Sequence, residues 1–326
     1  MMSLRGHDAA RAAFIAALGS GSLHHAWLLA GPEGVGKATF ARMVARRMLA
    51  EAATPDALPP GFAVPEDHQA ARLIAAGTHP DYREMRRLPK DPEKPDQDLA
   101  RSIPIAQVRA LMPLFATKPA LSARRVVVID AVDDLERPGA SNALLKNLEE
   151  PPQGTIFLLV SHAPGRLLPT IRSRCRLLRF EPLAMDDMRA VLGDAMPEAD
   201  RDEIEALVRA GAGSPGRALA YAGLDLAGID AALSTIGKSG DHDNAQRGRL
   251  AKALSAKAAQ PRYEAFLERV PGFIAEQAPY RAGEGLRTAL DAYDEARSIA
   301  GTARALTLDA GATVFELAGV VARLAR

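Results

Sequence analysis

The amino end of the chain alternates between segments of helical and of strand-like hydrophobic pattern. Residues 6–18 place apolar side chains at helical spacing and predict a short helix. Residues 26–30 form a brief run without polar positions, which is typical of a buried strand. The glycine-bearing stretch 31–37 follows, and an alanine-rich segment to about Leu49 then predicts a second helix. The predicted order is therefore helix, strand, loop and helix.

Prolines change the pattern over residues 52–102. They prevent any long regular element there, so we expect this segment to be a surface excursion. The prolines are Pro55, Pro59, Pro60, Pro65, Pro80, Pro89, Pro92 and Pro95. Order resumes at Pro104, a favoured first residue of a helix, and an apolar stripe then predicts a helix that lies on a sheet. The stripe consists of Ile105, Val108, Leu111 and Met112.

Two further apolar runs complete the pattern of the first half. Residues 124–130 lead from two arginines through four β-branched residues to a carboxylate, as expected of a central parallel strand with function at its carboxyl end. Residues 156–161 form a second such run. Between them, residues 140–150 have a helical pattern that Pro151 stops. This alternation predicts an α/β domain with a doubly wound parallel sheet over residues 1–182.

The second half of the chain lacks comparable strand patterns. From residue 183 onwards it carries alanine and leucine patterns that glycines and prolines interrupt, which predicts an all-helical region. The polar stretch 238–244 fits a loop between helices. A chain of 326 residues exceeds what one compact core usually fills, so we expect two or three domains.

Composition narrows the function classes. The formal net charge is only +1, so strong autonomous binding to DNA is not indicated. The single cysteine, Cys175, excludes an internal disulfide and fits a reducing compartment. The first residues lack the apolar core of a secretion signal, and no run of eighteen apolar residues predicts a membrane span. We therefore expect a cytoplasmic globular protein without membrane contact.

The strongest chemical motif is residues 31–37, Gly-Pro-Glu-Gly-Val-Gly-Lys, which fits the phosphate-loop pattern between a strand and a helix. Gly31, Gly34 and Gly36 let backbone amides surround phosphate oxygens, and Lys37 can reach the terminal phosphates. ATP or ADP is the expected ligand, although a tight glycine turn with a surface lysine is the bland alternative. Position 38 is Ala, where a hydroxyl would normally bind magnesium. Thr39 is rotated by about 100° on the helix, so it is a poor substitute.

Three further segments resemble one family. Residues 142–152 read Asn-Ala-Leu-Leu-Lys-Asn-Leu-Glu-Glu-Pro-Pro, and residues 172–175 read Arg-Ser-Arg-Cys. Together with residues 213–218 and the phosphate loop, they are similar in order and spacing to the motifs of clamp-loader AAA+ subunits of bacterial DNA polymerase III. The resemblance covers most of residues 1–220.

The resemblance implies roles for individual residues. Arg174 matches an arginine that, in this family, reaches into the ATP site of a neighbouring subunit, where a fixed cation supports phosphoryl transfer. Ser161 and Arg217 match the two nucleotide-sensing positions, although Ser161 equally suits capping of the next turn. Asp130 matches the acid on the magnesium side of the site, but Ala131 stands where active relatives carry a glutamate. We therefore expect weak or no nucleotide binding and weak or absent hydrolysis.

Two acids and the cysteine have plainer interpretations. Residues 133 and 134 are aspartates beyond the strand end, and we interpret them as solvated acids at a helix start. Cys175 is expected to pack. Relatives often carry a four-cysteine zinc module after the phosphate-loop helix, but residues 51–102 contain no cysteine, and His68 and His79 cannot replace it. We expect neither zinc nor another bound metal.

The resemblance also implies architecture and partners. The α/β domain would be followed by a helical lid over residues 183–226 and a helical collar for oligomerisation over residues 227–326. Partners would be the delta subunit, the gamma or tau ATPase subunits and the sliding clamp, with primed DNA reached through the complex. Two rival hypotheses are an autonomous ATPase of the gamma or tau class and a metabolic kinase with a phosphate loop. Ala38 and Ala131 oppose the first, and the kinase leaves the clamp-loader motifs unexplained.

Overall fold

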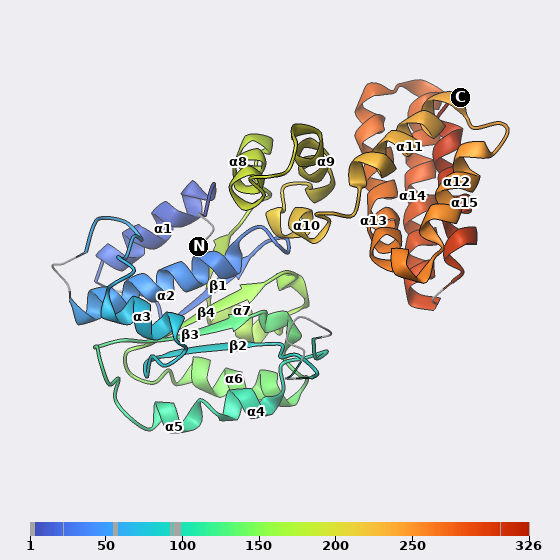
Figure 1. The fold of residues 1–326 in the computed structure, drawn as a ribbon. Helices are drawn as coiled ribbons and strands as arrows, with labels where there is room; N and C mark the ends of the chain where they lie inside the picture. Colours follow the sequence, from blue (N-terminus) through green and yellow to red (C-terminus); the bar gives the residue numbers. More distant parts are fainter. Residues whose placement is uncertain are drawn as a thin grey trace. The chain divides into compact units, whose positions relative to one another are not determined.

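A computed structural model describes most of the chain. The described residues are 4–21, 23–54, 58–91, 93, 99–306 and 308–325. They form two compact units, one that runs to Ala184 and one that begins at Met185. Strands and helices alternate in the first unit, and the described part of the second unit is helical (Figure 1).

A five-stranded sheet lies at the centre of the first unit. Its strands are β1 (Ala26–Ala30), β2 (Tyr82–Arg86), β3 (Arg125–Asp130), β4 (Thr155–Ser161) and β5 (Arg176–Arg179). The order across the sheet is β2-β3-β4-β1-β5, and every neighbouring pair is parallel. Strands β1 and β4 are buried at every position, as the apolar runs of residues 26–30 and 156–160 predict. The predicted α/β domain with a parallel sheet, followed by a helical region, is confirmed.

Helices cover both faces of this sheet (Figure 1). They are α1 (Asp8–Gly19), α2 (Lys37–Ala53), α3 (Gln69–Ala75), α4 (Ile105–Arg109), α5 (Met112–Phe115), α6 (Gly139–Glu149) and α7 (Pro169–Ser173). Trp27 of β1 contacts Phe14 of α1, whose ring also meets Phe40 of α2. The next strand residue, Leu28, joins the core on the opposite face, which includes Leu144 of α6. The alternation of side chains along a strand thus supplies two separate cores.

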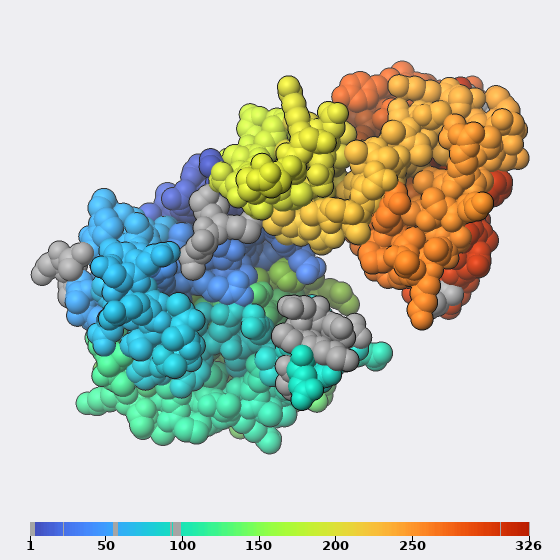
Figure 2. Space-filling view, in the orientation of Figure 1, coloured from blue at the N-terminus to red at the C-terminus, as the bar shows by residue number. Residues whose placement is uncertain are grey.

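Two segments differ from the predicted pattern. Helix α3 and strand β2 lie within the proline-rich residues 52–102, part of which forms the light-blue surface in Figure 2. Strand β2 is an edge strand in which only Met85 is buried, so its sequence lacks a strong apolar signal. The helix predicted after Pro104 is divided into α4 and α5, and Met112 is 56% exposed rather than part of the buried stripe. Pro113 stands in the first turn of α5, where a proline is tolerated.

The second unit contains eight α-helices in its described part. They are α8 (Met185–Ala195), α9 (Arg201–Gly211), α10 (Pro215–Ala220), α11 (Leu226–Ser239), α12 (Ala245–Leu254), α13 (Gln260–Gln277), α14 (Gly283–Leu306) and α15 (Ala310–Ala322). Aspartate and serine side chains cap several of them, for example Asp200 at α9 and Ser214 at α10. The all-helical second half is confirmed. Its division into a lid and a collar near residue 226 stays a prediction.

Candidate nucleotide-binding site

The loop of residues 31–37 joins β1 to α2 at the carboxyl end of the sheet. Gly36 precedes the helix with a φ of 107°, a conformation that favours glycine. A Cβ on Gly31 would lie 2.0 Å from the carbonyl oxygen of Phe180, so only glycine fits this approach to the chain after β5. Backbone geometry at both positions is therefore that of a tight glycine loop at a helix amino end, which is suited to an anion.

Lys37 is buried within its own loop. The side chain is 2% exposed, and its Nζ donates to the carbonyl oxygen of Gly31 at 2.7 Å and to that of Pro32. Burial lowers the pKa of Lys37 to about 8, while the charges of Glu33 and Asp130 oppose this shift. The ammonium therefore keeps most of its charge at neutral pH. To reach a phosphate, it would have to exchange these two carbonyl partners.

Position 38 departs from what magnesium needs. The ion of a phosphate-loop site normally takes a hydroxyl from the residue after the loop lysine. Ala38 and Thr39 both lie half-buried in the first turn of α2, and Ala38 carries no oxygen on its side chain. The side chains at this point of the loop do not fit the usual magnesium arrangement.

Asp130 belongs to an ionic cluster that sequence reasoning missed. Arg42 of α2 donates to Glu84 of β2 at 2.6 Å and to Asp130 at 3.1 Å. Tyr82 donates its hydroxyl to Glu84 at 2.9 Å. Burial alone would raise the pKa of Glu84, but the hydrogen bond and charge of Arg42 lower it overall. Asp130 therefore has an internal cationic partner, which no spacing in the sequence indicates because the two ends lie far apart in the chain.

Ser161 and Asp133 form a second polar anchor. The hydroxyl of Ser161 is fully buried and donates to Asp133 at 3.0 Å. The same carboxylate accepts the backbone N–H groups of His162 at 2.7 Å and Ala163 at 3.3 Å. Asp133 lies at the start of the short 3₁₀ helix Val132–Asp134, as interpreted, but its carboxylate also holds the chain that leaves β4 and does not face solvent alone. The neighbouring residue Ala131 is buried and supplies no carboxylate.

Arg174 connects two of the motifs that carry the family resemblance. It follows α7, where one guanidinium nitrogen donates to the carbonyl oxygen of Thr170 at 2.9 Å. The other nitrogen forms an ion pair with Glu149 at 2.8 Å, and the side chain of Arg174 is 34% exposed. The arginine is therefore held in one orientation while part of it stays accessible. Cys175 beside it is partly buried, and burial raises the pKa of its thiol to about 12.

A cavity of about 680 Å³ lies next to the phosphate loop. Its lining includes Gly31 and Pro32 of the loop, His162 after β4, and two arginines, Arg172 and Arg179. Burial and the nearby charge of Lys37 lower the pKa of His162, so this imidazole is mainly neutral at pH 7. The two arginines are site candidates that sequence reasoning did not select, and the only signal was their place in the arginine-rich stretch around Cys175.

Arg217 lies in the second unit. Its backbone N–H donates to Ser214 at the start of α10, and its side chain is exposed beside a cavity of that unit. The phosphate loop belongs to the first unit. The role of Arg217 as a nucleotide-sensing residue therefore stays a prediction.

The family model described as "DNA polymerase III, delta subunit" matches residues 6–184, which is more than half of the chain. The chain belongs to this family. A curated member of Pseudomonas aeruginosa, DNA polymerase III subunit delta prime, is 36% identical over 199 residues, which are 61% of this chain and 56% of the relative. Subunit delta prime of Escherichia coli is 34% identical over 207 residues, 63% of this chain and 57% of the relative.

The chain is also similar to another subunit of DNA polymerase III. Subunit tau of Escherichia coli is 31% identical over 265 residues, which are 80% of this chain and 38% of tau. The chain spans little more than half the length of the delta prime relatives that it matches.

Among the described residues, no helix is both long and apolar enough to cross a membrane. In the same part of the chain, no three or more His, Cys, Asp or Glu side chains are grouped so that they could hold a metal ion.

Proposed function

We propose that this protein is a delta prime-type subunit of the clamp loader of a bacterial DNA polymerase III. In this role it would act in the cytoplasm with the delta subunit and the gamma or tau subunits to load the sliding clamp onto primed DNA. The family relationship over residues 6–184 supports this assignment. The chain would take part in ATP-driven loading without being a strong ATPase itself.

The observation that carries the proposal is a phosphate loop without the groups that hydrolysis needs. Lys37 and the glycines are present, but Ala38 offers no hydroxyl for a cation. Ala131 is buried and offers no carboxylate to a water molecule, and Asp133 is already engaged by three donors. A site of this kind would bind ATP or ADP weakly or not at all.

Arg174 supplies the second part of the proposal. Its guanidinium is fixed by Glu149 and by the carbonyl oxygen of Thr170, yet it remains partly accessible. An oriented cation at the surface is what a neighbouring subunit could use to stabilise charge on a transferring phosphoryl group. We infer that Arg174 acts in trans on an adjacent gamma or tau site.

The test of an impaired site is the ATPase activity of the purified chain. With ATP and magnesium alone we expect no turnover above background, whereas addition of delta and gamma or tau subunits should give DNA-stimulated turnover. Lys37→Met should leave the activity of the assembled loader unchanged, because the catalysis would take place at the other subunits' sites. Robust turnover by the isolated chain that Lys37→Met abolishes would contradict the proposal.

A second candidate function is that of an autonomous gamma- or tau-like ATPase. The match to tau over 80% of this chain favours it. The same measurement separates the two functions, since only the second one requires turnover by the chain alone. The substitutions at positions 38 and 131 are the reason to prefer the first.

A further inference from the structure

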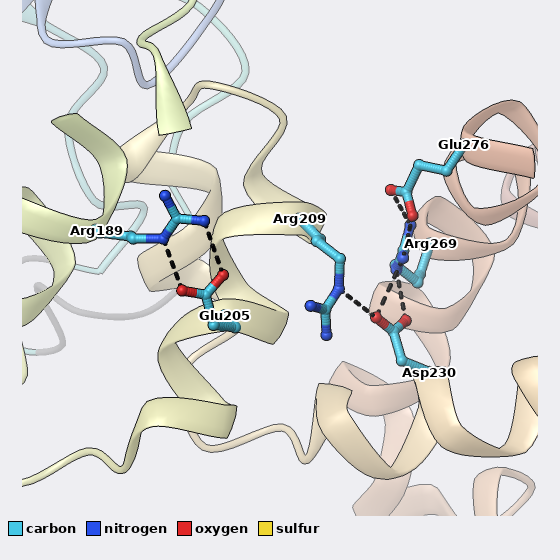
Figure 3. Close-up of polar contacts among 6 residues, drawn as sticks. All are labelled: Arg189, Glu205, Arg209, Asp230, Arg269 and Glu276. Carbon is cyan, nitrogen blue, oxygen red and sulfur yellow. Dashed lines mark hydrogen bonds and ion pairs between the residues drawn. The ribbon is translucent and has the colours of Figure 1, made fainter. Parts of the chain in front are cut away.

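Asp230 connects two groups of helices within the second unit. The first group, the three-helix segment, is α8–α10, and the second, the five-helix segment, is α11–α15. Arg209, in the last turn of α9, forms an ion pair with Asp230 of α11 at 3.5 Å. Arg269 of α13 approaches the same carboxylate and donates to its two oxygens at 2.6 and 3.1 Å (Figure 3). The carboxylate of Asp230 therefore has one arginine partner from each segment.

Arg269 fixes the orientation of Asp230. Its side chain is 3% exposed, and on its other side it donates to Glu276 at 2.8 and 2.9 Å (Figure 3). Burial alone favours the neutral guanidine, but the hydrogen bonds to Glu276 and Asp230 outweigh it and raise the pKa of Arg269. A buried and bidentate arginine of this kind holds both carboxylates in place. Asp230 is thus a preoriented acceptor for Arg209.

The carboxylate of Glu268 also has partners from both segments. Tyr221, which follows α10 and is 8% exposed, donates its hydroxyl to Glu268 of α13. Arg304 of α14 donates to the other oxygen of this carboxylate at 3.2 Å. Each of the two carboxylates on the five-helix segment is therefore held by an arginine of that segment and receives one donor from the three-helix side.

One residue of each contact, Arg209 and Glu268, lines a cavity at the junction of the two segments. The cavity measures about 370 Å³ and is lined by both charged and small apolar residues. Its lining includes Arg209, Arg217, Glu268, Arg269, Gly272 and Glu276. Because the cavity leaves part of the junction unfilled, the polar contacts add to the packing of α9 against α11 in setting the angle between the segments.

We propose that the pairs Arg209–Asp230 and Tyr221–Glu268 are two latches that hold the three-helix segment at one angle on the five-helix segment. When both are released, the connection of residues 222–225 acts as a hinge. This device concerns the second unit alone, so it does not depend on the nucleotide site or on Arg174.

The test uses Arg209→Gln with Tyr221→Phe in the full chain. This variant removes both donors from the three-helix side and leaves the buried Arg269 untouched. The matched control is Arg189→Gln with Tyr263→Phe, which removes the same chemical groups. Arg189 pairs with Glu205 at 2.6 Å inside the three-helix segment (Figure 3). The hydroxyl of Tyr263 is buried without a hydrogen-bond partner among the described residues, so its loss should release nothing.

The first readout is hydrogen exchange of the amides around the connection, residues 222–229. We expect about tenfold faster exchange in the latch variant, because two hydrogen bonds to charged groups no longer oppose opening. Amides of α15 should keep their rates, which would show that the five-helix segment stays folded. The control should match the native chain at both places.

The second readout is the distance between spin labels on the two segments. Labels at Asp202→Cys and Arg287→Cys occupy exposed positions on α9 and α14, and Cys175→Ala removes the native thiol. The latch variant should give a broader distance distribution than the native chain, and the control should not. Arg209→Gln alone, at a side chain that is 43% exposed, should give part of the broadening without risk to the core. The proposal is overturned if the latch variant and the control give the same exchange rates and the same distance distributions.

Discussion

Asp133 offers the sharpest test of how the candidate site is built, through the substitution Asp133→Ala. The change leaves three donors without their acceptor: the fully buried hydroxyl of Ser161 and the amides of His162 and Ala163. A buried donor without a partner costs about 1–3 kcal/mol, and water can reach part of this half-exposed position. We therefore expect the free energy of unfolding of the first unit to fall by about 3 kcal/mol.

The assay is urea unfolding of the full chain followed by tryptophan fluorescence. Trp27 is the only tryptophan and is buried in β1, so its signal reports the first unit even if the two units unfold separately. The control is Asp8→Ala, which removes an 89% exposed carboxylate and should cost less than about 0.5 kcal/mol. Ser161→Ala combined with Asp133→Ala should show a coupling of about 1 kcal/mol. An Asp133→Ala midpoint no lower than that of Asp8→Ala would refute the anchoring role.

Three further predictions concern the loop and the cysteine. The pKa of Lys37 is lowered to about 8 in the folded state and is 10.5 in the unfolded state, so the folded chain binds fewer protons between these values. The free energy of unfolding of the native chain relative to Lys37→Met should therefore rise between pH 8 and 10. A difference in urea midpoints that does not change with pH would contradict this. Gly31→Ala should destabilise the first unit by at least about 2 kcal/mol, because the new Cβ would lie 2.0 Å from the carbonyl oxygen of Phe180. Gly165→Ala should not destabilise it, because the space around Gly165 is open. Equal urea midpoints for the two variants would contradict this prediction. Cys175, whose pKa is raised to about 12 by burial, should react with iodoacetamide at pH 8 more slowly than free cysteine until urea unfolds the chain, as mass spectrometry can measure.

The buried centre of the fold could be predicted because its sequence signals are strong. Strand β1 is apolar throughout, and β3 and β4 have continuous apolar centres, which is how strands covered on both faces appear in a sequence. The phosphate loop was equally clear, since Gly31 and Gly36 meet backbone constraints that only glycine satisfies. Local pattern and tertiary environment agree at these positions.

Edge strands and long-range polar contacts could not be predicted in the same way. Strand β5 has the sequence Arg-Leu-Leu-Arg and strand β2 buries only Met85, so neither shows a strong apolar pattern. The pairing of Arg42 with Glu84 and Asp130 joins residues far apart in the chain, as does that of Ser161 with Asp133. Such contacts depend on which strands become neighbours, and residue spacing carries no signal for that. The same holds for the ion pair between Arg174 and Glu149, although both residues lie in recognisable motifs.

We propose above all that Arg174 serves the ATP site of a neighbouring subunit. The measurement is the DNA-stimulated ATP turnover of a loader reconstituted from the delta subunit, the gamma or tau subunits and this chain with Arg174→Ala. The control is the same loader with Arg109→Ala, which changes an exposed arginine of α4. An arginine of this kind contributes roughly 10³–10⁵ in rate at the site that it serves, so we expect the variant to assemble normally and to lose the share of turnover that comes from the adjoining site. Turnover of the Arg174→Ala loader equal to that of the Arg109→Ala loader, at the same degree of assembly, would contradict the account.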